Sequence, residues 1–176
     1  MRSSYNKNGE EVDDRTMAEL ASGVSSLALD SYSDFGVGAA VEVQIDTPHR
    51  TQYHVYQGIN INLSGMEYKL HAEQMAVFNA LLDLRNADVE EYATLKRVVV
   101  HTTENDHSLV CGHCIQVLHG VCNHLDQLPV DVAYWGVRGK ELYDGRGNPD
   151  GVHFTYRKEN LGELIEKTYV HNREDN

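Results

Sequence analysis

The segment LKRVVVHTT, residues 95–103, constrains the fold more than any other part of the chain. It is rich in β-branched and apolar residues, as is typical of a strand that is buried on both faces of a sheet. Helical patterns flank it at 71–85 and 111–124. Because such a strand needs helices to cover its sheet, this segment predicts the central strand of an α/β sandwich.

The remaining segments continue this alternation of element types. Residues 37–45 and 51–59 alternate in polarity and are separated by TPHR, which predicts a β-hairpin. Further expected elements are a helix at 14–29 capped by Asp13 or Asp14, strands at 129–137 and 154–157, a loop or short irregular hairpin at 138–152, and a helix at 160–170. Two strand–helix–strand crossovers should join parallel neighbours. The order predicts a three-layer α/β/α sandwich with a mixed central sheet, and we expect residues 1–176 to form a single domain.

The charge of the chain excludes several classes of partner. There are 15 Lys and Arg residues against 27 Asp and Glu, a net charge of −12, and the cations are scattered singly. Nucleic acids and anionic membranes require clustered cations. No apolar run approaches the roughly 18 residues of a membrane span, and MRSSYNKNGEE at the amino terminus lacks the apolar core of a signal peptide. We therefore expect a cytoplasmic protein that binds neither nucleic acid nor membranes.

Two predicted helices begin with side chains that are unusual for a buried helix. The segment HAEQMAVFNALL has apolar residues at helical spacing, but its first turn carries His71 and Glu73. The second helix begins at CGHC, where Cys111 and Cys114 are three positions apart. In α/β sandwiches ligands bind where strands end and helices begin. We expect the two helix starts to meet at one point.

The donor atoms at this point suit zinc. Zn²⁺ favours thiolate and imidazole ligands, and catalytic zinc keeps three protein ligands and a water. The positive end of a helix favours the thiolate form of a cysteine. Neither motif offers an evident fourth ligand, so we expect a catalytic Zn²⁺ held by His71, Cys111 and Cys114.

Glu73 then has a chemical role. The pKa of a zinc-bound water falls to about 7, and a neighbouring carboxylate can take its proton and deliver it to a ring nitrogen and a leaving amine. His-x-Glu followed by Cys-x-x-Cys matches the known pattern of zinc deaminases. We expect Glu73 to be the catalytic proton shuttle.

Other uses of the cysteines remain open. Three cysteines without a secretion signal disfavour a disulfide framework. A redox pair of Cys111 and Cys114 is an alternative, although it does not account for the His-x-Glu pair. We expect Cys122 to be a small buried apolar side chain and His113 to be exposed.

Four ordered motifs together resemble those of the cytidine deaminases of nucleoside salvage. They are YSDFGVGAAV (32–41), GININ (58–62), HAEQ (71–74) and CGHCIQVL (111–118). The resemblance spans roughly residues 14–136. It implies a zinc hydrolase that converts cytidine or deoxycytidine to uridine or deoxyuridine plus ammonia.

The resemblance also implies substrate contacts. Phe35 takes the position of the family's aromatic ring, which lies against the base, and Asn60 that of the asparagine that binds the ribose 3′-hydroxyl. Asn62 stands where the family has a ribose-binding Glu. The backbone of Ala72 matches a contact to the pyrimidine oxygen.

Further departures from the motifs of the family affect the predicted substrate more than the predicted metal site. Val110 replaces a proline before the first cysteine, Ile115 replaces an arginine after the second, and residues 160–169 are at best a remnant of the family's tail. A modified cytidine or another amino-heterocycle is therefore the alternative substrate. A non-catalytic zinc-stabilised binding protein is a different-class alternative, for which Glu73 would be unnecessary. Resemblance to one-domain members implies a homo-oligomer, with a tetramer favoured over a dimer, whose active sites neighbouring subunits complete.

Overall fold

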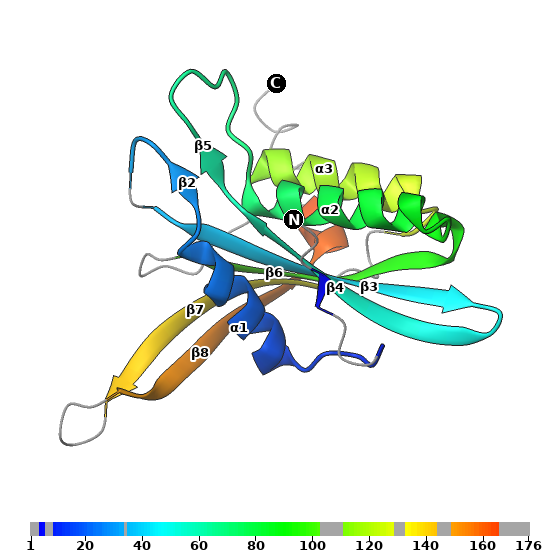
Figure 1. Cartoon of the computed structure of the whole chain (residues 1–176), viewed down its shortest axis with the longest axis horizontal. Helices are drawn as coiled ribbons and strands as arrows, with labels where there is room; N and C mark the ends of the chain where they lie inside the picture. Colours follow the sequence, from blue (N-terminus) through cyan, green and yellow to red (C-terminus); the bar gives the residue numbers. More distant parts are fainter. Residues whose placement is uncertain are drawn as a thin grey trace.

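A six-stranded sheet with the strand order β1-β4-β3-β6-β7-β8 forms the centre of the protein (Figure 1). The computed structural model describes residues 4–5, 9–33, 35–102, 111–128, 133–143 and 149–165. The strands of this sheet are β1 (Ser4–Tyr5), β3 (Val37–Thr47), β4 (Arg50–Ile59), β6 (Ala93–Thr102), β7 (Ala133–Tyr143) and β8 (Pro149–Asn160). A second, parallel two-stranded sheet consists of β2 (Leu29–Asp30) and β5 (Ile61–Asn62).

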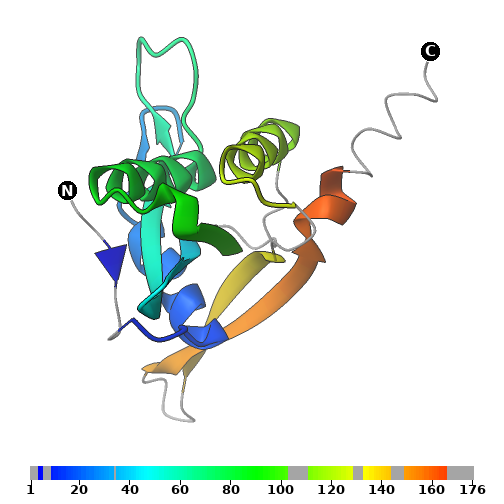
Figure 2. The same ribbon diagram turned by 90° about the vertical axis from the view of Figure 1, so that its right-hand side faces the viewer.

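Helices cover both faces of the main sheet. The helix α1 (Asp14–Ser25) packs on one face, and α2 (Ala72–Asn86) and α3 (Gly112–His124) lie side by side on the other (Figures 1 and 2). A 3₁₀ turn, η1 (Glu90–Tyr92), precedes β6, and residues 161–165 are also helical. The predicted sandwich of helices around a mixed sheet is confirmed.

The helix α1 begins at the predicted cap and ends before its predicted end. The Oδ1 atom of Asp13 accepts a hydrogen bond from the backbone N–H of Thr16 at 2.8 Å, which satisfies one of the unpaired donors of the first turn. The helix ends at Ser25 instead of residue 29. Residues 29–30 instead pair with residues 61–62, so backbone pairing to a distant strand overrides the local helical pattern.

The predicted β3–β4 hairpin is confirmed, but its place in the sheet differs from expectation. The chain passes from β4 through α2 to β6, and β6 lies beside β3, to which it is antiparallel. The expectation that this crossover joins parallel neighbours is therefore wrong. A tight turn between Thr47 and Arg50 pairs β3 with β4. The strand β6 pairs with the other edge of β3, so the connection from β4 through α2 to β6 passes across the face of β3. The second crossover, from β6 to β7, does join parallel neighbours.

For residues 138–152 we expected a loop or a short irregular hairpin, and the structure shows a hairpin that is longer and more regular than expected. The strand β7 extends to Tyr143, and β8 begins at Pro149, so the two form a long antiparallel hairpin. The Gly, Asp and Asn content of this segment suggested a loop, but strand formation depends more on cross-strand partners than on intrinsic preference. The predicted strand at 154–157 is confirmed as part of β8. Residues 166–170 of the predicted last helix lie outside the described residues.

The strand β6 is buried on both faces, as its sequence predicts. Val98 and Val100 belong to the apolar core beneath α2 and α3, whereas Val99 belongs to the core beneath α1. All three side chains are at most 1% exposed. Because successive side chains of a strand point to opposite faces, one β-branched run supports both layers of helices. In the described part of the chain, no helix has the length and apolar character needed to cross a bilayer.

Candidate metal centre and adjoining pocket

A close approach of α2 to β4 sets the position of His71 and Glu73. A Cβ atom at Gly58 would lie 2.3 Å from the carbonyl oxygen of Ala72, which is backbone and cannot yield. Only glycine permits this contact. The Oε1 atom of Gln74 accepts a hydrogen bond from the backbone N–H of His71 at 3.0 Å, which closes the first turn. The first turn of α2 is thus held firmly against the sheet.

The start of α3 brings the predicted cysteines to the same place. Cys111 caps the helix, because its Sγ atom accepts from the backbone N–H of Cys114 at 3.4 Å. The same Sγ atom lies 3.4 Å from Nδ1 of His71. The ligand atoms of His71, Cys111 and Cys114 all lie within 4.8 Å of one another. The structure therefore brings together the three residues that we predicted as ligands.

This arrangement fits a tetrahedral metal ion. With ordinary Zn–S and Zn–N bond lengths, a tetrahedral site separates sulfur from nitrogen by about 3.6 Å. The observed 3.4 Å between Cys111 Sγ and His71 Nδ1 is close to that separation. Among the described residues, this group contains no fourth His, Cys, Asp or Glu. Such an incomplete set is typical of a metal site that leaves one position for a reactant.

The electrostatics of the group also favour a cation. Cys114 is fully buried, and its burial raises the pKa of its thiol well above the ordinary value. The carboxylate of Glu73 and the sulfur of Cys111, both adjacent, raise this pKa further. The thiolate form therefore requires a positive charge nearby, and a coordinated metal ion supplies that charge and deprotonates the thiol.

A pocket of about 280 Å³ adjoins this group. Its lining combines the helix starts with the loops that precede β3 and α2, and consists of Asp30, Phe35, Val37, Asn60, Ile61, Asn62, Lys69, Leu70, His71, Ala72, Glu73, Val100, Thr102 and Cys111. The four residues that we predicted as substrate contacts, Phe35, Asn60, Asn62 and Ala72, are all among them. Their placement is observed, whereas their roles stay predictions.

Asn60 holds the segment that carries Phe35. Its Oδ1 atom accepts from the backbone N–H of Val37 at 2.7 Å, and its Nδ2 atom donates to the carbonyl oxygen of Phe35 at 3.1 Å. A carboxamide has two acceptor positions and two N–H donors. One of each therefore remains for a ligand, so Asn60 can both position Phe35 and contact a substrate.

Sequence reasoning missed Asp30, which lines the pocket beside Asn62. The predicted helix at 14–29 placed Asp30 at a helix end, with no indication of a partner. In the structure the Nδ2 atom of Asn62 donates to Oδ1 of Asp30 at 2.9 Å. The pattern Asp-Ser-Tyr-Ser at 30–33 was the available signal, because Asp and Ser side chains stabilise such turns. Lys69 and Leu70, also missed, directly precede His71.

The other predicted features of this region have mixed outcomes. Cys122 is fully buried in the apolar core, and His113 is exposed, as expected. The ring of His113 lies edge-on to that of His71, with 6.3 Å between their centroids. Ile115 is buried, with 4% of its surface exposed. Val110 lies outside the described residues.

Comparison with known proteins identifies the fold. No protein-family model matches the sequence, and no curated protein matches it. The cytidine deaminase of Burkholderia pseudomallei is similar in structure, with a TM-score of 0.58, 19% sequence identity, and coverage of 87% of this chain and 96% of that chain. The cytidine deaminase of Mycobacterium tuberculosis has a TM-score of 0.52 and 19% identity, with 88% and 94% covered. Over most of its length, this chain therefore has the fold of bacterial cytidine deaminases.

Proposed function

We propose that this chain is a zinc-dependent hydrolase that converts cytidine or deoxycytidine to uridine or deoxyuridine plus ammonia. The observation that carries the proposal is the convergence of His71, Cys111 and Cys114 beside the buried carboxylate of Glu73, at the edge of a pocket. The fold shared with cytidine deaminases supports it independently.

Different residues at the pocket would supply the metal site and the proton transfer. His71, Cys111 and Cys114 would hold Zn²⁺, which supplies Lewis-acid activation of a water molecule near neutral pH. Glu73, with 5% of its surface exposed, is shielded from bulk solvent and faces the pocket. Its carboxylate can accept one proton of the attacking water and deliver it to the ring nitrogen, and it can then carry the second proton of the same oxygen to the departing amine.

The rest of the pocket suits a small aromatic substrate. Phe35 is partly exposed and lines the pocket, so its ring can pack against a pyrimidine. Asn60 and the backbone of Ala72 offer polar contacts to the sugar and the base. The volume of about 280 Å³ lies just below the usual range for small-molecule sites, about 300–1,000 Å³. A single nucleoside is therefore a better match than a nucleic acid strand.

A panel of aminopyrimidine nucleosides tests this proposal. We expect purified protein to contain close to one zinc per chain and to deaminate cytidine or deoxycytidine, followed by ultraviolet absorbance, with kcat/KM in the usual enzyme range of about 10⁴–10⁸ M⁻¹s⁻¹. Turnover of only a modified cytidine or another amino-heterocycle would keep the zinc chemistry and replace the substrate. Stoichiometric zinc without turnover of any panel member would instead support a zinc-stabilised binding protein.

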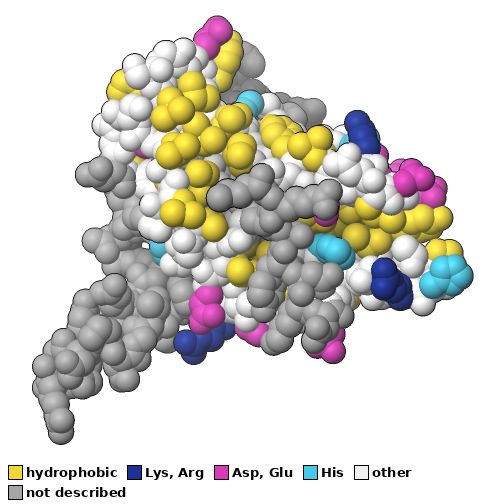
Figure 3. Space-filling model, in the orientation of Figure 1, with side chains coloured by type: hydrophobic (Ala, Val, Ile, Leu, Met, Phe, Trp, Pro, Cys, Tyr) yellow, Lys and Arg dark blue, Asp and Glu magenta, His cyan; other side chains and the backbone are white. Residues whose placement is uncertain are grey.

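We further propose that the protein is a homo-oligomer, with a tetramer favoured over a dimer. The helix α2 buries Ala76, Ala80 and Leu84, yet its outer face exposes 44% of Phe78 and 63% of Leu82. A helix that is apolar on both faces is normally covered on both. Figure 3 shows further apolar side chains over the upper part of the molecule. A second copy of the chain can cover such a surface.

Light scattering tests the oligomeric state. We expect a mass several times that of the 19.8 kDa chain, and a shift to smaller species in the double variant Phe78→Ser/Leu82→Ser. The single variant Glu19→Gln, an exposed change on the opposite helix α1, is the control. A stable and active monomer would refute the proposal.

A further inference from the structure

The small β2–β5 ladder places two polar side chains together in the pocket. Asp30 and Asn62 are directly opposite each other in this parallel pair. The backbone N–H of Ser31 donates to the carbonyl oxygen of Asn62 at 2.9 Å, and that of Leu29 donates to the carbonyl oxygen of Asn60 at 3.1 Å. The position of Asp30 is therefore determined by the backbone on both sides of it.

The hydrogen bonds of Asp30 leave one of its oxygens available. Its Oδ1 atom accepts from the backbone N–H groups of Tyr32 at 2.8 Å and Ser33 at 3.2 Å, and from Asn62 Nδ2 at 2.9 Å. Its Oδ2 atom accepts from the Ser33 hydroxyl at 3.0 Å. Each oxygen of a carboxylate offers about two acceptor positions, so Oδ2, which accepts one bond, can accept a second. Asp30 is partly exposed and lines the pocket.

Asn62 differs from Asp30 because its side chain is buried and donates the hydrogen bond between the two residues. Its side chain is buried, with 6% of its surface exposed, and its amide nitrogen points to Asp30. The backbone N–H of Tyr32, followed by the Ser33 hydroxyl and Asn62, lowers the pKa of Asp30 below its ordinary value. Asp30 is therefore ionised at neutral pH, and the donors that hold it are the Tyr32 N–H, Ser33 and Asn62.

We propose that Asp30 is the residue that accepts a hydrogen bond from a sugar hydroxyl of the substrate, and that Asn62 is a positioning residue that orients it. This inference rests on the proposed nucleoside deaminase function. It moves the hydroxyl-binding role from Asn62, where the resemblance places it, to a residue 32 positions earlier in the chain. A negatively charged acceptor selects for hydroxyl groups and against phosphate at the same position.

The test compares two substrates that differ only in their sugar hydroxyls. We expect wild-type protein to favour cytidine over 2′,3′-dideoxycytidine in kcat/KM. Asparagine forms the same kind of turn as aspartate, so Asp30→Asn should keep the local fold. Because a charged acceptor forms a bond roughly twice as strong as a neutral one, Asp30→Asn should lower this preference by about tenfold. Asp46→Asn, the same change at the far end of the β3–β4 hairpin, is the matched control and should leave the preference unaltered.

A swap of the two residues tests the assignment independently. The double variant Asp30→Asn/Asn62→Asp can keep a hydrogen bond between the two side chains. It exchanges their chemistry, so that position 62 carries the carboxylate and position 30 the carboxamide. We expect it to recover part of the preference for cytidine that Asp30→Asn loses. This result separates a hydroxyl contact from a purely structural turn, because the swap restores the charge but not the original turn residue. Should Asp30→Asn fail to fold or to bind zinc, Asp30→Ser takes its place, because serine also stabilises such turns but carries no charge: its preference for cytidine should fall below that of the wild type, and an unchanged preference would overturn the inference.

The opposing results are distinct. Equal losses on both substrates in Asp30→Asn would reduce Asp30 to a structural role and overturn the inference. A collapse of the preference in Asn62→Ala, with Asp30→Asn unchanged, would return the role to Asn62. Wild-type protein that deaminates both substrates equally also overturns the inference while the proposed function stands. Failure to deaminate either substrate overturns the proposed function and the inference with it.

Discussion

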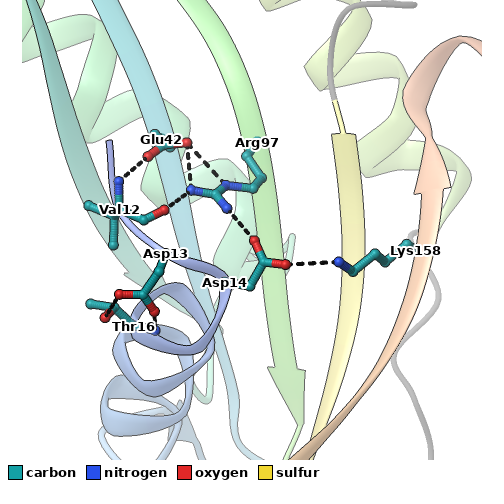
Figure 4. A network of polar contacts seen from close by, with 7 residues as sticks. All are labelled: Val12, Asp13, Asp14, Thr16, Glu42, Arg97 and Lys158. Atoms are coloured by element: carbon teal, nitrogen blue, oxygen red, sulfur yellow. Dashed lines mark hydrogen bonds and ion pairs between the residues drawn. The ribbon is translucent and has the colours of Figure 1, made fainter. Parts of the chain in front are cut away.

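Two clusters of polar side chains, each with a buried carboxylate, lie on opposite faces of the central sheet, and they balance their charges differently. On the α1 face, Arg97 of β6 lies 2.8 Å from Glu42 of β3 and 2.8 Å from Asp14 of α1 (Figure 4). Lys158 of β8 lies 2.9 Å from Asp14. On the other face, His71, Cys111, Cys114 and Glu73 meet at the starts of α2 and α3.

The first cluster is complete within the chain. Glu42 accepts from the backbone N–H of Val12 at 3.1 Å, and the Val12 carbonyl accepts from Arg97 (Figure 4). Burial raises the pKa of Glu42, while the Arg97 guanidinium acts in the opposite direction. The chain thus provides both the carboxylates and the two cations that neutralise them, Arg97 and Lys158, and these contacts tie the segment before α1 to the sheet.

The second cluster lacks such an internal cation. Of the described residues that line its pocket, Lys69 is the only Lys or Arg, and its side chain is exposed. Burial raises the pKa of the Cys114 thiol, and the adjacent Glu73 carboxylate and Cys111 sulfur raise it further. The comparison teaches that a buried polar cluster with its own counter-charge is structural, whereas one without it points to an external cation and to chemistry.

A substitution in the second cluster should have the largest effect, on zinc content and on activity. Cys111→Ala removes one of the three proposed metal ligands, so we expect the variant to lose both the zinc and the proposed deaminase activity. Metal analysis after gentle purification, together with an ultraviolet assay, measures this loss. Cys122→Ala, at a buried cysteine outside the cluster, is the control and should keep its zinc. Full zinc content in Cys111→Ala would remove the basis of the comparison.

Glu73→Gln separates chemistry from metal binding in the same cluster. The amide is nearly isosteric but cannot accept the proton, so we expect zinc to stay bound and kcat to fall by about 10²–10⁴-fold or more. Steady-state kinetics and metal analysis of the same preparation provide both readouts. A variant that keeps a tenth of normal turnover would show that Glu73 is not the proton shuttle.

Substitutions in the first cluster should lower the stability of the protein and leave its catalytic chemistry unchanged. Arg97→Met leaves Glu42 buried without its cation, so we expect the free energy of unfolding to fall by about 3–5 kcal/mol. The double variant Arg97→Met/Glu42→Leu removes both charges and should recover much of that loss. Urea unfolding measures both variants. Loss of zinc in Arg97→Met under native conditions would show that the two clusters are coupled.

The smallest expected effect concerns pH. His101 of β6 contacts the Ser25 hydroxyl on the α1 face, with 3.1 Å between Nδ1 and Oγ, and burial lowers the pKa of its imidazole. The unfolded chain therefore binds a proton more readily than the folded protein. The stability that neutral His101 contributes is fully present above about pH 6.5 and is lost as pH falls through its folded pKa.

Unfolding experiments from pH 7.5 to 5 measure this slope, which a single histidine limits to about 1.4 kcal/mol per pH unit. His101→Gln should reduce the slope but not abolish it, because burial also lowers the pKa of His54. An exposed histidine offers a matched control in His49→Gln. Identical slopes in wild type and His101→Gln would exclude His101 as the source.

Much of the fold and of the metal centre follows from local sequence patterns. The spacing of apolar residues predicts α2, α3 and the β3–β4 hairpin, and the cap at Asp13 is where its side-chain chemistry indicates. The choice of His71, Cys111 and Cys114 as proposed ligands follows from residue type, because only a few side chains bind zinc well. These features depend on near neighbours in the chain, so the sequence by itself determined them.

Features that depend on distant partners were decided only by the tertiary structure. The insertion of β3 between β4 and β6, the long β7–β8 hairpin and the early end of α1 all arise from backbone pairing that no local pattern reveals. The contact between Asp30 and Asn62 has the same origin, because parallel pairing of β2 and β5 brings together residues whose segments have no relation in sequence. Residue type and local spacing therefore indicated the group of side chains that could hold a metal ion, and long-range strand pairing decided that the carboxylate of Asp30 lines the pocket beside it.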